Sequence, residues 1–376
     1  MATSYAFTFN LGPLPMRIEG DHPVTRWAMR VYAPLATNAA PQLIFRFVAD
    51  LPPLPADAVG DADVQVAPGE MRFRERRYDI RISGGDPLLV ELRQRDRRPL
   101  WLRSLADPEA AYKMWLSHGA SLDTHLLKEF AYTIAPLAIH AALLRRDAAL
   151  IHAGCIAVGD RAVLLPAWGG VGKSTIVSRA VLHGSARFLA DDHAVIDAAG
   201  LVHPHLLPMH IYHYHTTQDA VLRQRVLAAC SPGNRAQWQL ASLLRRKRVV
   251  RWVSPTDVFG QAKLASPARI EQVILMFRGE SRDFSWQEID PAEAARPCTG
   301  VIFEEVNAMP ARLALAGAGW ASTVLPDLGD AVTHTRNLYT AAFQNARCAK
   351  LLVPRGAPPA ALLDFLRPRC PLLASL

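Results

Sequence analysis

The chain has 376 residues, enough for roughly two or three domains with hydrophobic cores of their own. Half of the residues are hydrophobic and 20% are charged, a globular composition that excludes disorder for most of the chain. The 42 basic and 34 acidic residues leave a net charge of +8, which favours phosphate-bearing or acidic partners at long range.

Several classes of protein are disfavoured by what the sequence lacks. No apolar run reaches the roughly 18 uninterrupted residues of a membrane span, and the N-terminus has no secretory signal pattern, so we expect a cytoplasmic protein with no membrane partner. The five cysteines are scattered and form no C-x-x-C pair, which indicates reduced thiols. No nucleic-acid-binding signature is present, and we expect no nucleic-acid partner.

The N-terminal part predicts β structure. Between residues 5 and 92, short apolar runs such as 43–45 and 88–90 alternate with clusters of Pro, Gly and Asp, which is typical of strands and turns. Residues 51–63 are rich in Pro, Asp and Ala and predict a loop. We therefore expect a small β-rich domain over 1–120, which would recognise the acceptor or cover the site.

The segment from 121 to 200 predicts a helix followed by a compact αβ motif. Apolar residues recur at steps of three and four between 121 and 144, as in an amphipathic or buried helix. Strand-like runs at 149–158 and 161–165 flank the turn Gly159-Asp160 and predict a hairpin. A glycine-rich loop, a helix over 173–183 and a strand over 187–190 follow.

The rest of the chain predicts a helical insertion and further α/β elements. Helical spacing near 217–250 is interrupted by Ser231-Pro232-Gly233. Beyond it, strands are expected at 272–277 and 350–353, and helices at 338–345 and 359–366. The expected fold class is α/β, α+β overall, with a second domain over 121–376.

The residues from Ala167 to Thr175 match the phosphate-loop pattern G-x-x-x-x-G-K-[ST] at every defined position except the first, where Ala167 replaces glycine. An apolar strand precedes them and a helix follows, which is the setting that the motif requires. Alanine at the first position excludes an easy positive φ and is expected to cost about 1 kcal/mol.

Each residue of the loop has an expected role toward a nucleotide. The backbone N–H groups of Gly169, Gly170, Val171 and Gly172 would point toward the phosphate oxygens and bind them, and the dipole of the helix N-terminus would add to this binding. Lys173 would reach the β- and γ-phosphates, Ser174 would place its hydroxyl on Mg²⁺, and Thr175 would add a second contact.

Two aspartates close the strand that follows the loop helix. Asp191 and Asp192 are adjacent carboxylates, of which one can bind Mg²⁺ while the other accepts the proton of an attacking hydroxyl. Their mutual repulsion raises one apparent pKa toward that of a useful base. His152, in the strand ahead of the hairpin, could orient one aspartate or share its proton. The alternatives are an exposed Asp-Asp turn and a histidine in the core.

Taken in order, His152-Ala-Gly, the loop Ala167-Trp-Gly-Gly-Val-Gly-Lys-Ser and the run Leu189-Ala-Asp-Asp192 resemble the HPr serine kinase/phosphorylase family. That family shares its nucleotide core with phosphoenolpyruvate carboxykinase. The resemblance covers residues 148–200 and extends loosely to 350–366. It implies a P-loop kinase core that uses ATP and Mg²⁺, with Lys173 and Ser174 on the phosphates and the metal, Asp191 as general base supported by His152, and Asp192 as metal ligand.

The sequence also departs from that family. The Val-Glu-Ile-Arg-Gly-type run of true HPr kinases is absent, and Val273 to Gly279 is only a faint echo of it. HPr is therefore a poor candidate for the acceptor. Relatives of this kind phosphorylate a serine of a ribosomally made precursor peptide, or a small hydroxyl compound. The sequence leaves open the acceptor, ATP against GTP, phosphorolysis and homo-oligomer formation.

Two clusters and two rival functions complete the expectations. Five histidines crowd residues 203–215 without metal-ligand spacing, and we expect a polar strand or loop, with a substrate-lining role as the alternative. The basic run at 245–251 suits a helix C-terminus or an anion clamp. A P-loop GTPase or motor ATPase is disfavoured because N-K-x-D and L-S-G-G-Q are absent. An ATP-sensing module without phosphotransfer would not need an acceptor-side base.

Overall fold

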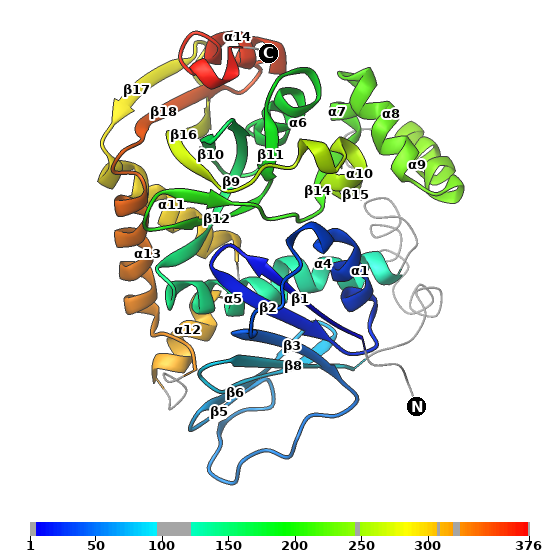
Figure 1. Ribbon diagram of the computed structural model, residues 1–376, viewed down its shortest axis with the longest axis vertical. Helices are drawn as coiled ribbons and strands as arrows, with labels where there is room; N and C mark the ends of the chain where they lie inside the picture. The colour runs from blue at the N-terminus through cyan, green and yellow to red at the C-terminus, as the bar shows by residue number, and fades with distance from the viewer. Residues whose placement is uncertain (1–4, 96–121, 245–248, 307–308, 319–323, 375–376) are drawn as a thin grey trace. The chain divides into compact units, whose positions relative to one another are not determined.

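The computed structural model describes residues 5–95, 122–244, 249–306, 309–318 and 324–374 (Figure 1). It confirms a mixed α/β protein, α+β overall, with about 39% helix and 33% strand. Contacts between Cα atoms divide the chain into two compact units. We call them the sheet unit, with the described residues of 5–95, 125–150 and 302–338, and the glycine-loop unit, with those of 122–124, 151–301 and 339–374.

This division differs from the one expected at residue 120, because the segments 125–150 and 302–338 pack with the N-terminal sheet. The sheet has eight strands in the order β1-β2-β3-β8-β7-β6-β5-β4. The strands are β1 Ala6–Leu11, β2 Leu14–Glu19, β3 Leu43–Val48, β4 Val59–Gly60, β5 Val64–Ala67, β6 Glu70–Glu75, β7 Tyr78–Ser83 and β8 Leu88–Gln94. The expected β-rich N-terminal part is therefore confirmed for the described residues.

A helix that the punctuation of this region did not predict, α1 Pro23–Val31, packs on β1 and β2. His22 caps its N-terminus by accepting a hydrogen bond from the backbone N–H of Val24, and Pro23 stands at the first turn, where proline is favoured. Its buried side chains include Val24, Trp27 and Val31, which share one helical face. The short helix η1 Ala33–Leu35 follows.

The expected helix over 121–144 is confirmed, with one irregular turn. It consists of α4 Leu122–Glu129, the π-helical turn Phe130–Ile134 and α5 Ala135–Leu144. Pro136 lacks the N–H that a regular turn needs, and the backbone instead closes an i→i+5 bond from Ala135 to Phe130. Among the described residues this is the one helical stretch, Leu126–Leu144, long and apolar enough to cross a membrane, and 78% of it is buried, as in a core helix.

The glycine-loop unit is built on a sheet whose central strands are parallel (Figure 1). β10 pairs in parallel with β16, and β16 in parallel with β18, while β9 and β17 add antiparallel strands. β11 pairs with β9, and β13 joins β12 to β16. The strands are β9 Ala148–Val158, β10 Arg161–Pro166, β11 Arg187–Ala190, β12 His193–Asp197, β13 Leu201–His203, β16 Ala268–Gly279, β17 Ser285–Ile289 and β18 Arg347–Pro354.

The local predictions for this unit are confirmed closely. The hairpin forms with Val158 opposite Arg161, and the loop helix α6 runs over Lys173–His183 with Gly184 at its C-terminus. The strand at 187–190 and the helix α14 Pro359–Leu366 have the expected bounds, whereas the helix expected at 338–345 is α13 Leu328–Ala342. The remaining helices of this unit are α10 Pro255–Phe259, η3 Gln261–Lys263, most of α11 Pro291–Glu305 and η4 Pro371–Leu373, whereas α12 Met309–Ala318 belongs to the sheet unit.

The predicted helical insertion is confirmed, and the two strands at its ends pair with each other. It holds α7 His213–Thr217, α8 Ala220–Ala229 and α9 Pro232–Leu244 (Figure 1). The strands at its two ends, β14 Met209–Tyr212 and β15 Val250–Val253, pair antiparallel with Tyr212 opposite Val250. The insertion therefore begins and ends at one place beside the sheet. Most of the basic run, 245–248, lies outside the described residues.

Candidate functional site

A strand, a loop and a helix position the phosphate-loop residues as the motif requires. β10 ends at Pro166, and α6 begins at Lys173 with Gly172 as its N-terminal cap. Gly170 and Gly172 have φ of 81° and 118°, conformations that a side chain disfavours. A Cβ at Gly169 or Gly170 would meet nothing within 4 Å. The loop backbone is therefore curved and open on its outer side.

The expected strain at Ala167 does not arise. Ala167 is absent from the described residues with positive φ, and it forms a parallel bridge to Met276 of β16. It continues the strand pairing instead of starting the tight turn, so the 1 kcal/mol expected at this position is not incurred. The neighbouring Trp168 is 41% exposed, and its ring lies 5.9 Å from that of Phe277.

Lys173 is folded back into the unit. Its side chain is 5% exposed, and its Nζ donates to the carbonyl oxygen of Ala167 and to Nε2 of His152. Val171 and Thr175 are also buried, one in the loop and the other in the first turn of α6. The lysine thus holds the loop together from inside, and its ammonium lies at the start of the helix, where phosphate-loop lysines are needed.

His152 contacts the lysine, where the resemblance implied support for Asp191. Burial, and then the neighbouring charge of Lys173, hold the pKa of His152 well below its usual value. The imidazole is therefore neutral at neutral pH and able to accept from the lysine. Two residues further along β9, Gly154 allows close packing, because a Cβ there would lie 3.0 Å from Val177 and 3.6 Å from Oδ1 of Asp191.

A strained turn separates the two aspartates. Asp192 has a φ of 70°, which is rare for a residue other than glycine, and the N–H of His193 donates to the carbonyl oxygen of Asp191. The carbonyl oxygen of Asp192 accepts from the N–H of Ala153 in β9. Because of this turn the two carboxylates have different hydrogen-bond partners. Ser174 Oγ donates to Oδ1 of Asp191 at 3.1 Å. Nδ1 of His210 donates to Oδ2 of Asp192 at 2.6 Å.

The two carboxyl groups consequently differ in pKa. Burial and the charge of Asp192 raise the pKa of Asp191 to about 7. Burial alone would also raise the pKa of Asp192, but the charge and hydrogen bond of His210 outweigh it and hold that pKa well below the usual range. One carboxylate stays ionised, and the other exchanges a proton near neutral pH, as a general base requires.

One oxygen of Asp191 is left over. The residue is 1% exposed, and its Oδ2 has no hydrogen-bond partner in the described part of the chain. A buried carboxylate oxygen without a partner is costly and rare in native proteins, so it points to a ligand, an ion or a transferable proton. Among the described residues, this feature distinguishes the site from an ordinary aspartate turn.

The histidine-rich segment contributes more to the site than its spacing indicated. His210 of β14 binds Asp192 and lies edge-on to Trp252, with 4.8 Å between ring centroids. The other histidines have separate roles: His203 pairs with Asp197, and His205 hydrogen-bonds with the backbone of His193. No group of three or more His, Cys, Asp or Glu side chains that could hold a metal occurs in the part of the chain that the structure describes.

Two further residues belong to this region: Arg278, whose place after a strand made it a candidate phosphate contact, and Tyr214, to which the sequence assigned no role. Arg278 is the last residue but one of β16, and the pairing of β16 with Ala167 places it at the same sheet edge as the phosphate loop. Its guanidinium is exposed and makes no ion pair or hydrogen bond with described residues. Burial is the main cause that raises the pKa of Tyr214 in α7 to about 12, and the charges of Arg278 and Asp191 also act on this pKa.

The donor set fits Mg²⁺ better than a metal with an all-protein shell. Mg²⁺ takes one or two carboxylates and completes its octahedron with water and substrate phosphates. The hydroxyl of Ser174 and the ionised carboxylate of Asp192 are hard oxygen ligands of this kind. A zinc site would instead need several nitrogen or sulfur ligands together.

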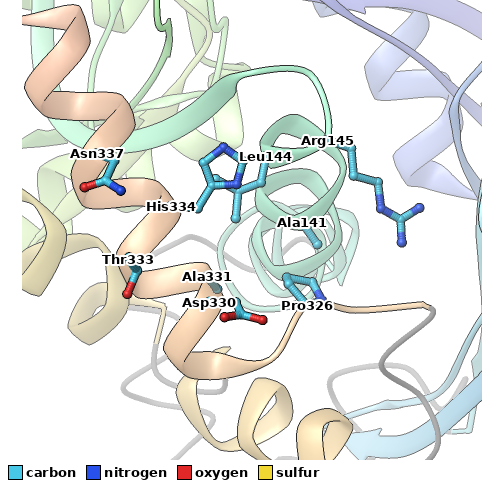
Figure 2. A pocket seen from close by; sticks show the side chains of 9 residues that line it. All are labelled: Ala141, Leu144, Arg145, Pro326, Asp330, Ala331, Thr333, His334 and Asn337. Atoms are coloured by element: carbon cyan, nitrogen blue, oxygen red, sulfur yellow. The ribbon is translucent and has the colours of Figure 1, made fainter.

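A separate cavity of about 640 Å³ lies within the sheet unit (Figure 2). It is lined mainly by α5 and α13, with Leu144, Asp330 and His334 among its residues. Figure 2 shows Arg145 extending away from His334, and its guanidinium donates to the carbonyl oxygens of Gly85 and Val324. The cavity contains none of the phosphate-loop or aspartate residues, so we assign no chemistry to it.

Comparison with known proteins does not name a relative. No protein-family model matches this chain, and no curated protein matches its sequence.

Proposed function

We propose that this protein is a Mg²⁺- and ATP-dependent kinase that transfers the γ-phosphate to a hydroxyl, a serine of a peptide or protein in the first instance. One observation carries the proposal: the hydroxyl of the phosphate-loop Ser174 lies 3.1 Å from Asp191, whose pKa is about 7 and whose second oxygen has no partner. Phosphate binding and proton transfer are thereby supported at one place, in the HPr-kinase-like arrangement that the motifs resemble.

The phosphate loop supplies binding and positioning. Its backbone N–H groups and the N-terminus of α6 favour an anion, and Lys173 needs only to exchange the Ala167 carbonyl for phosphate oxygens to reach the γ-phosphate. Arg278, exposed at the same sheet edge, is a further donor for phosphate oxygens. Phosphoryl transfer needs mainly such positioning and neutralisation of charge.

Asp191 would take the proton in the transfer step. The acceptor oxygen forms a bond to the γ-phosphorus as the bond from that phosphorus to the β,γ-bridging oxygen breaks, and ADP leaves. The proton of the acceptor hydroxyl passes to the free Oδ2 of Asp191. A pKa of about 7 suits this task, because the group is partly ionised beforehand and holds the proton afterwards.

Ser174 and Asp192 would hold Mg²⁺, with His210 keeping the Asp192 carboxylate ionised. When bound, the ion neutralises charge on the phosphate oxygens. The roles of the two aspartates are separable by experiment. Asp191→Asn should abolish transfer but leave the Mg²⁺ concentration for half-maximal ATP binding unchanged, and Asp192→Asn should raise that concentration. The opposite pattern would reverse the two roles.

An ATP sensor is the second candidate that the motifs allow. A sensor needs the phosphate loop, but it has no use for a buried carboxylate poised near neutral pH beside the loop serine. That pair therefore favours the kinase.

The proposal is tested by transfer of label from γ-labelled ATP to a panel of acceptors: HPr, serine-containing peptides and free hydroxyl compounds. Label in one acceptor, lost in Lys173→Ala and Asp191→Asn but kept in the surface control Arg296→Ala, would support a kinase and name its acceptor class. ATP binding without label in any acceptor, unchanged in Asp191→Asn, would favour the sensor.

A further inference from the structure

The helical insertion carries a groove that the nucleotide chemistry does not use. It has a volume of about 310 Å³ and lies between α7, α8 and α9, with His213, Thr216, Arg223, Leu227, Trp238 and Leu243 in its lining. We call it the insertion groove. Its walls combine an indole and two leucines with hydroxyl and guanidinium groups, which suits a segment with both apolar and polar side chains.

Apolar side chains also stand exposed beside the insertion groove. Leu243 is 75% exposed and Leu240 50% exposed, and because they are three residues apart in α9 they lie on one face of the helix. Val221 of α8 is 40% exposed. Such a concentration on two short helices is typical of a surface that binds a partner.

The charge of the insertion determines which partner fits. Between residues 213 and 251 the sequence has eight Lys or Arg and one acidic residue, Asp219. That aspartate is already engaged, since it accepts hydrogen bonds from the N–H of Leu222 and from Nε2 of His183. Residues 245–248 lie outside the described part of the chain and Arg251 is buried, but the exposed Arg223, Arg225 and Arg235 give the described helices an excess of positive charge that complements an acidic segment.

One of these cations is buried behind the groove. Arg251 is 4% exposed, and its guanidinium carbon lies 5.0 Å from the ring of Trp238, which lines the groove. It donates to the carbonyl oxygen of Val250 and to Gln237, but its Nε has no partner and no described carboxylate pairs with it. Burial lowers the pKa of Arg251 to about 10. A buried charge without a counter-ion favours an anionic ligand nearby.

One short helix connects the groove to the proposed phosphate site along the chain. α7 contributes His213 and Thr216 to the lining and begins directly after β14, whose His210 binds Asp192. Between them in sequence, Tyr214 lies close enough to feel the charge of Asp191. A chain bound in the groove can therefore reach the aspartates over the length of one short helix.

From these observations we infer that the insertion groove docks an acidic peptide segment with apolar anchors, and that this segment belongs to the phosphate acceptor. The docking itself depends on the groove alone, whereas its link to the acceptor rests on the proposed kinase function. Leucine-type side chains would occupy the space between Leu227, Trp238 and Leu243, and carboxylates would face Arg223, with the charge of Arg251 behind Trp238 adding to the attraction.

The test is fluorescence anisotropy with labelled short peptides in which net charge and leucine content vary independently, using the full chain without nucleotide. We expect acidic peptides with leucines to bind, and binding to weaken about tenfold or more in Leu243→Ser and in Arg223→Glu. Matched controls, Leu315→Ser and Arg296→Glu, change an exposed leucine and an exposed arginine elsewhere and should bind as the wild type does.

The outcomes separate docking from catalysis. Binding by Lys173→Ala equal to the wild type, together with loss in the groove variants, supports the docking site whether or not label is transferred. No binding by any peptide, equal binding of basic peptides, groove variants that bind normally, or preferential binding of a labelled oligonucleotide would overturn it. If docking holds and tethering a serine to the best peptide yields no phosphorylation, the kinase proposal fails while the groove assignment stands.

Discussion

Replacing Asp191 by asparagine should make the free protein more stable at alkaline pH while abolishing phosphate transfer. The side chain is 1% exposed, and its pKa is raised from 3.8 to about 7, mainly by burial and then by Asp192. The folded state therefore holds the proton more tightly than the unfolded state does. The stability linked to this proton is fully present below the unfolded pKa and is lost as the pH rises through the folded pKa.

The magnitude follows from the size of the shift. Each unit of pKa corresponds to 1.36 kcal/mol, so the full shift represents about 4 kcal/mol, of which about 3 kcal/mol falls between pH about 5 and pH about 8. Asparagine keeps an acceptor for the hydroxyl of Ser174 but carries no charge at either pH. The variant should therefore gain up to about 3 kcal/mol over the wild type between these two pH values.

Urea denaturation of both proteins at the two pH values measures this difference, with the exposed Asp283→Asn as control. Transfer of label by the variant should fall by about 10²–10⁴-fold, the usual contribution of a general base. A stability difference between variant and wild type that does not change with pH would refute the argument, because Asp191 would then be ionised in the folded protein at no cost. A difference that grows in the Asp283 control as well would refute it too.

Three further predictions concern residues around the pair. His210→Ala removes the hydrogen bond that keeps Asp192 ionised, so ATP binding should need about tenfold more Mg²⁺ for half-saturation. Titration of ATP binding with the metal measures this concentration, and His210→Gln should restore part of the Mg²⁺ affinity. Gly172→Ala places a Cβ on a residue with φ 118° and 3.1 Å from Leu362. This substitution should lower the free energy of unfolding by about 1 kcal/mol or more and raise the KM for ATP in steady-state assays. The control Gly356→Ala, whose Cβ would meet nothing within 4 Å, should do neither. Arg278→Ala should lower kcat about tenfold or more without changing the melting temperature, because its guanidinium is exposed and unpaired among the described residues.

Local signals in the sequence predicted the elements that carry the phosphate loop. The hairpin around Gly159-Asp160, the helix Lys173–His183 and the strand 187–190 depend on short-range spacing, turn chemistry and glycine placement, all of which are readable along the chain. α1 had a signal as well, because His22 and Pro23 form a helix start ahead of apolar residues at helical steps. The alternation of apolar runs with Pro, Gly and Asp clusters over 5–92 predicted only strands and turns there, and this helix was missed.

The partnerships in the site could not be predicted from spacing. His210 meets Asp192 because β14 lies beside the aspartate turn, and Asp191 meets Ser174 across the gap between a strand end and a helix. These contacts depend on tertiary packing. The grouping of 125–150 and 302–338 with the N-terminal sheet has the same cause, because no periodicity in one segment specifies the segment on which it packs.

The most direct test of the account is calorimetric titration of ATP into the protein with and without Mg²⁺, in the wild type, Lys173→Ala and the surface control Arg296→Ala. The account predicts binding that Mg²⁺ strengthens, that Lys173→Ala loses, and that Arg296→Ala keeps. Absence of ATP binding by the wild type, or equal binding by Lys173→Ala, would contradict the assignment of residues 167–175 as a nucleotide site.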